Sequence, residues 1–96
     1  MLHHIVMWQL HETDKANNLQ QAARLLQACA AITPGIVRFE VAMALPGLDC
    51  THDLVLNSTF ADRAALEAYQ SHPDHVAIKP FMKSVVASRQ CMDYET

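Results

Sequence analysis

The chain has 96 residues, of which 51% are hydrophobic and 18% are charged, and its formal net charge is −3. This length predicts one domain over residues 1–96, and the apolar composition excludes a disordered chain. The seven lysines and arginines are scattered singly, which argues against nucleic acid and against an anionic membrane surface as partners.

The first predicted element is a strand over Leu2–Leu10, a segment rich in apolar and β-branched residues. Alternate residues fall on two faces, His4, Val6, Trp8 and Leu10 on one, and His3, Ile5, Met7 and Gln9 on the other. Both faces are largely apolar, whereas a sheet with one face in water alternates apolar and polar residues. We therefore expect helices to cover one face and a partner subunit to cover the other.

A helix is predicted next, because small and apolar side chains recur at helical spacing opposite polar ones. Thr13 or Asp14 can cap its start, and it should run to about Ala31. Pro34 and Gly35 follow and stop it.

Two further strands are expected in the middle of the chain. Ile36–Leu45 alternates, with one face formed by Val37, Phe39, Val41, Met43 and Leu45. A Pro-Gly turn and a loop separate it from Leu54–Phe60, which has the composition of the third strand.

A second helical region should open at Asp62, whose side chain can cap it, and bend near His72. Pro73 can restart the helix, because its fixed φ suits the first helical position. Pro80 limits how far the helix continues, and Ser84–Tyr94 has the β-branched opening and the length of a last strand.

The resulting order, βαββαβ, predicts an α+β, ferredoxin-like fold: a four-stranded antiparallel sheet with helices on one face. The other sheet face would stay uncovered in a monomer. Closing two such sheets face to face would bury it, so the sequence predicts a homodimer through the sheet faces, a dimeric α/β barrel.

The cysteines and the N-terminal segment indicate the cellular compartment of the protein. Cys29, Cys50 and Cys91 are widely spaced without a Cys-x-x-Cys pair, and the start of the chain lacks the pattern of a signal peptide. No apolar run approaches the roughly 20 residues of a membrane-spanning helix. We expect a cytoplasmic protein with reduced thiols and no membrane partner.

His4 is a candidate site residue, because a polar ring on the face of Val6 and Trp8 needs a hydrogen-bond partner or a wet cavity. In a 4-1-3-2 strand order the last strand runs antiparallel beside the first, which brings Asp93 close to His4. A hydrogen bond between them would orient the ring, in either a structural or a catalytic role.

A second cluster is Tyr69, His72 and His75, spaced at i, i+3 and i+6. On a continuous helix they would line one wall. With a break at Pro73, His72 would instead cap the restarted turn while Tyr69 and His75 point toward the sheet. Tyrosine and neutral histidine within reach of one substrate form a plausible acid and base pair.

Metal and cofactor sites are not predicted. His72 and His75 supply two metal ligands where a site needs three or more, and no metal-binding motif accompanies them. Gly35 and Gly47, each beside a proline, form no phosphate-binding loop. We expect neither a metal nor a cofactor.

Essentially the whole chain resembles the stress-responsive dimeric A/B-barrel (Dabb) family. The matching stretches are HHIVMWQL, TPGI, DLVLNSTFADRAALEAYQSHPDHVAI and MDYE. The most specific part is Tyr-x-x-His-Pro-x-His at Tyr69–His75, after an Asp-x-x-x-Leu helix opening at Asp62. The resemblance implies the ferredoxin-like fold and a dimer formed through the sheets.

One branch of this family, the plant olivetolic acid cyclases, is similar to the chain at His4, Tyr69, His72, His75 and Asp93. This similarity implies that the tyrosine and histidines act as acid and base in the C2–C7 aldol closure of a polyketide chain. Two further polar positions of the cyclase pocket fall at Leu26 and Leu54 in this chain.

Three functions fit these observations. The first is a dimeric barrel protein that binds a small apolar or aromatic molecule between sheet and helices. The second is a cyclase-like lyase that uses the same cavity for proton transfer, and the third is a purely structural, stress-associated dimer. The residues expected in the site are His4, Tyr69 and His75 as catalytic groups, and Trp8, His72 and Asp93 as substrate-binding groups.

Overall fold

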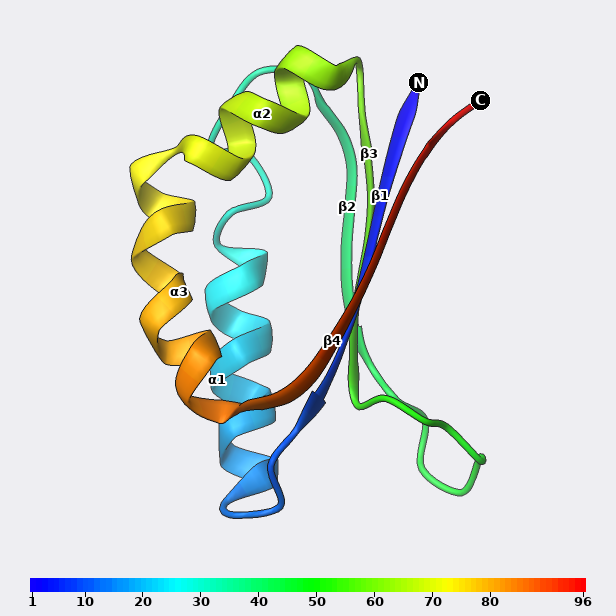
Figure 1. Ribbon diagram of the computed structural model, residues 1–96, viewed down its shortest axis with the longest axis vertical. Helices are drawn as coiled ribbons and strands as arrows, with labels where there is room; N and C mark the ends of the chain where they lie inside the picture. The colour runs from blue at the N-terminus through cyan, green and yellow to red at the C-terminus, as the bar shows by residue number, and fades with distance from the viewer.

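The computed structural model describes residues 1–96 as an antiparallel sheet with helices packed on one face (Figure 1). Its strands are β1 (Leu2–Leu10), β2 (Ile36–Met43), β3 (Leu54–Phe60) and β4 (Val86–Glu95), and its helices are α1 (Lys15–Gln27), α2 (Arg63–Ser71) and α3 (Pro73–Val85). The strand order is β2-β3-β1-β4. This order confirms the predicted ferredoxin-like arrangement. None of the three helices has the length and apolar character needed to span a membrane.

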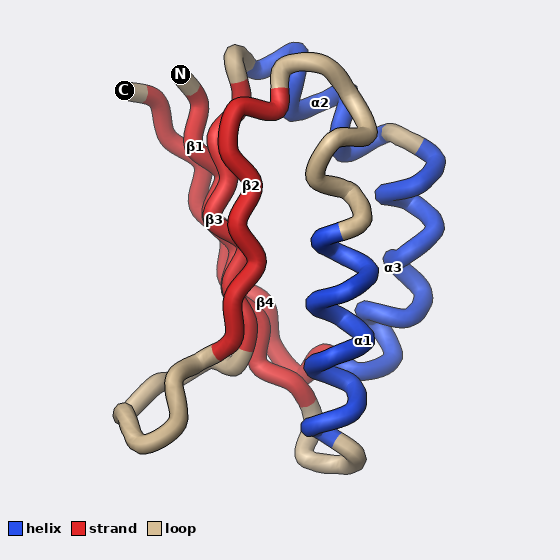
Figure 2. Tube along the Cα trace, turned by 180° about the vertical axis from the view of Figure 1, so that it is seen from behind, coloured by secondary structure: helices blue, strands red, loops and turns tan.

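The two faces of β1 have different surroundings, although both are largely apolar. His4, Val6, Trp8 and Leu10 are buried beneath the helices, which all lie on this side of the sheet (Figure 2). On the opposite face Met7 is 39% exposed. One face of the central strand thus forms the core, and the other is open in a single chain.

Strand β2 differs from its predicted pattern at the edge of the sheet. The pairing with β3 shifts between Ile36 and Arg38, so Val37 is an extra residue in a bulge and is 55% exposed. The bulge interrupts the predicted alternation of β2 at Val37. The strand ends at Met43, so Leu45 also lies outside it.

Helix α1 begins where it was predicted and is shorter than predicted at its C-terminal end. It begins at Lys15 and ends at Gln27, and turns rather than helix follow as far as Ala31. Asp14 occupies the N-cap position in a left-handed conformation with φ of 53°, and its side chain makes no capping hydrogen bond. Its carboxylate accepts a hydrogen bond from the Asn17 side chain instead, so the expected side-chain cap is absent.

The second helical region is divided at His72, as the sequence predicted. The Asp62 side chain accepts a hydrogen bond from the Ala65 amide at 2.8 Å and caps α2. Extended backbone at His72 separates α2 from α3, and its Nδ1 accepts a hydrogen bond from the amide of the second α3 residue. Both caps explain why two short helices form here rather than one long helix.

Helix α3 passes through Pro80 and ends at Val85, so β4 begins at Val86 and not at Ser84. A proline removes one helical hydrogen bond, but Pro80 faces solvent, where water can replace it. Met82 and Val85 are buried in the core and hold the last turn against the sheet. The prediction that Pro80 limits the helix is wrong for this reason.

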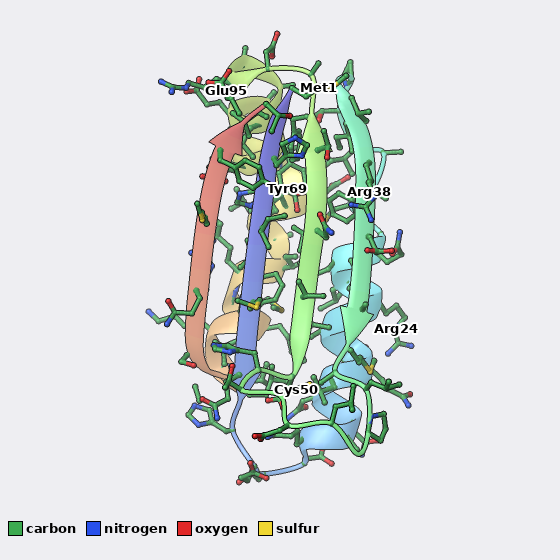
Figure 3. The ribbon with its side chains drawn as sticks, turned by 90° about the vertical axis from the view of Figure 1, so that its right-hand side faces the viewer. Met1, Arg24, Arg38, Cys50, Tyr69 and Glu95 are labelled. Carbon is green, nitrogen blue, oxygen red and sulfur yellow. The ribbon has the colours of Figure 1, made fainter.

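The open face of the sheet lies toward the viewer in Figure 3, with the helices behind it. Large apolar side chains on this face are exposed, among them Met7, Met92 and Tyr94. Arg38 and Glu40 form an exposed ion pair on the outer strand β2. The face is thus apolar at β1 and β4 and charged at one edge.

Candidate functional site

A cavity of about 550 Å³ lies between the sheet and the helices. Its apolar wall includes Val6, Trp8, Leu26, Leu56, Ile78 and Met82. Four of the predicted site residues also line it, namely His4, Trp8, Tyr69 and His75. An apolar cavity with a few converging polar groups is the usual form of a small-molecule site.

His4 enters the cavity wall from β1 and is only 3% exposed. It pairs directly across the ladder with Asp93 of β4, and its Nδ1 is hydrogen-bonded to the Asp93 carboxylate. The predicted contact is confirmed. A carboxylate only accepts hydrogen bonds, so His4 Nδ1 carries a proton.

Tyr69 reaches the cavity from α2 and lies behind the sheet in Figure 3. Its ring packs against Phe39, Phe60 and His75, with centroids 5.7, 5.3 and 4.6 Å away. The side chain is 1% exposed, and its hydroxyl has no hydrogen-bond partner. Burial, and secondarily the charge of Cys29, raises the pKa of Tyr69, so its phenol stays protonated at neutral pH.

His75 follows in the first turn of α3. Its Nδ1 lies 3.1 Å from the carbonyl oxygen of Gln70, which only accepts, so Nδ1 carries the proton and Nε2 has a free lone pair. Burial is the largest cause of its lowered pKa, opposed by the Gln70 hydrogen bond. The charges of Lys79, His4 and Arg89 lower it further, which keeps the ring neutral.

Two predicted substrate-binding residues lie outside the cavity wall. His72 caps α3 and does not line the cavity. Asp93 contacts the site only through His4. The ligand atoms of His4, Cys91 and Asp93 come within 4.8 Å of one another, but a metal ion there would have to displace the hydrogen bond between His4 and Asp93.

The cavity is also lined by four residues that were not predicted, Gln70, Lys79, Lys83 and Arg89. Lys79 and Lys83 follow His75 at intervals of four residues and so share its face of α3. That spacing was visible in the sequence. It did not indicate a shared helix face, because the helix was expected to be limited at Pro80.

The matches to known proteins cover nearly the whole chain. A family model described as "Stress responsive A/B Barrel Domain" matches residues 2–96, and no curated protein matches the chain. A dimeric protein of unknown function from Bacteroides fragilis is 28% identical, with 99% of this chain and 95% of that chain covered and a TM-score of 0.85. A Dabb family protein from Mesorhizobium loti is 27% identical, with 99% and 95% covered and a TM-score of 0.70. A dimeric ferredoxin-like protein from Thermobifida fusca is 20% identical, with 99% and 90% covered and a TM-score of 0.88.

Proposed function

The chain belongs to the stress-responsive A/B-barrel family, and from that premise we propose that it is a homodimer that binds a small, partly apolar molecule in the cavity between sheet and helices. The apolar wall would hold the body of the molecule. His4, Tyr69 and His75 would contact its polar atoms, and Trp8 would pack against its apolar part. Asp93 would fix the orientation of His4.

The observation that carries this proposal is the hydroxyl of Tyr69. A buried hydroxyl without a partner costs about 1–3 kcal/mol, so such groups are rare unless a ligand or water completes them. Thr33 is the other residue with a buried unpaired side-chain oxygen, and it does not line the cavity. A ligand carbonyl seated beside Tyr69 would supply the missing acceptor.

Tyr69→Phe should therefore weaken binding without weakening the fold. For the neutral ketone 4-phenylbutan-2-one, we expect about a three- to tenfold loss of affinity, equal to one hydrogen bond. The free energy of unfolding should stay the same or rise by about 1 kcal/mol, because an unpaired buried hydroxyl is removed. Affinity is measured from the shift of the His75 imidazole NMR signals, and stability from urea unfolding.

Tyr94→Phe is the matched control, since Tyr94 lies on the open face of the sheet and is 43% exposed. It should leave the affinity for the ketone unchanged. If Tyr69→Phe instead destabilised the fold and left the affinity intact, the hydroxyl would serve the structure, and the purely structural reading would be favoured.

The homodimer is supported by the uncovered apolar side chains of β1 and β4 and by relatives described as dimeric. Light scattering should give twice the 10.7 kDa mass of one chain. Met7→Glu places a charge at the centre of this face and should raise the dimer dissociation constant about tenfold or more. Val76→Glu is the control, because Val76 is 46% exposed on a helix. Wild type that ran as a folded monomer would contradict the proposal.

A second candidate function is acid–base catalysis in the same cavity, and the tautomer of His75 favours it. With Nδ1–H donated to Gln70, a neutral His75 offers Nε2 as a base, and the ring of Tyr69 lies 4.6 Å away. His75 would remove a proton beside a carbonyl while the Tyr69 hydroxyl donates to the carbonyl oxygen. Proton transfer of this kind is the chemistry required by a cyclase-like lyase.

A further inference from the structure

We propose that the molecule taken by this cavity is an apolar or aromatic acid, whose anionic group is bound at the mouth by Lys79, Lys83 and Arg89. The inference rests on the proposed function and adds the chemical class of the ligand.

Every formally charged side chain in the wall is cationic. Lys79, Lys83 and Arg89 line the cavity, and no aspartate or glutamate does. These three are nearly half of the seven lysines and arginines in a chain whose net charge is −3. None of the three forms an ion pair with a carboxylate of the chain. They are therefore free to bind an anion.

The three cationic side chains come from two elements that border the opening of the cavity. Lys79 and Lys83 are one turn apart on α3, on the face that also carries His75. Arg89 comes from β4, where it pairs in register with Trp8 of β1. All three are exposed, whereas Trp8 and Leu26 deeper in the wall are 6% and 2% exposed. The cavity thus has an apolar interior and a cationic rim.

The charge of the rim extends into the cavity. After burial, the causes that lower the pKa of His75 include the positive charges of Lys79 and Arg89. The nearby Asp93 carboxylate is hydrogen-bonded to His4 and does not line the cavity. A neutral apolar ligand would leave the rim charges unpaired, whereas an acid would place its anion among them with its apolar part inside.

The test uses two fluorescent probes that share an anilinonaphthalene body: anionic 8-anilinonaphthalene-1-sulfonate and neutral N-phenyl-1-naphthylamine. Affinities are measured at low ionic strength, because salt screens exposed charges. Binding in the cavity is scored from the His75 imidazole NMR signals. The decisive quantity is the ratio of the two affinities, because the shared apolar body largely cancels in it.

In the variant Lys79→Gln, Lys83→Gln, Arg89→Gln, the ratio should fall about tenfold while the neutral probe binds within twofold of wild type. The control variant Arg24→Gln, Arg38→Gln, Arg63→Gln changes the net charge equally but removes no cavity residue, and it should keep the wild-type ratio. An equal fall in both variants, or no fall in either, would overturn the anionic ligand class while leaving cavity binding intact. If neither probe shifted the His75 signals in wild type, the proposed function itself would fail.

Discussion

Gly35→Ala should lower the free energy of unfolding by about 2–5 kcal/mol, whereas Gly47→Ala should cost about 1–2 kcal/mol. Both glycines have φ of +87°, which a residue with a side chain adopts only under strain. At Gly35 an added Cβ would also lie 2.7 Å from the Cβ of Ala65, while at Gly47 nothing lies within 4 Å. Urea unfolding measures the free energy of unfolding of both variants, and the difference between them is the cost of the contact with Ala65.

The same substitution should disturb the cavity. Ala65 lies on α2 four residues before Tyr69, so the two share one helix face, and an added methyl group would push that face away from the sheet. Ligand affinity should therefore fall in Gly35→Ala and not in Gly47→Ala. Equal losses of stability in the two variants would show that only the backbone conformation matters at Gly35.

Much of the fold follows from local patterns in the sequence. Leu2–Leu10 is apolar on both faces, which predicted a strand with helices on one of them, and Asp62 and Pro73 have the side chains that begin helices. The errors fall where tertiary packing overrides a local rule. Pro80 does not end α3, because the residues after it are anchored in the core, and the β2 bulge at Val37 depends on pairing with β3.

The candidate site was predictable to a smaller degree. The contact between His4 and Asp93 follows from strand order alone, since the ladder brings these two positions opposite each other. The missing partner of the Tyr69 hydroxyl was not predictable, because it depends on every side chain packed around the ring. Arg89 could have been found from the same ladder, since the register that pairs His4 with Asp93 also pairs Trp8 with Arg89.

If His75 acts as a base, the wild-type protein should accelerate deuterium exchange at the carbon beside the carbonyl of 4-phenylbutan-2-one in D₂O. Nε2 would take the α-proton, and the electron pair left on carbon would move to the carbonyl oxygen, where the Tyr69 hydroxyl donates a hydrogen bond. Return of a deuteron from His75, after exchange with solvent, completes the cycle. His75→Gln should lower the rate about 10²- to 10⁴-fold, the usual contribution of a positioned base, as measured by NMR.

His11→Gln is the control, because His11 is exposed and does not line the cavity, and it should exchange at the wild-type rate. The pH profile supplies a second criterion. Only neutral His75 can act as a base, and burial lowers its pKa from the ordinary 6.5, so the rate should hold as the pH drops through 6.5 and decline only below it. Ketone that shifts the His75 signals without faster exchange would remove catalysis and leave binding as the function of the cavity.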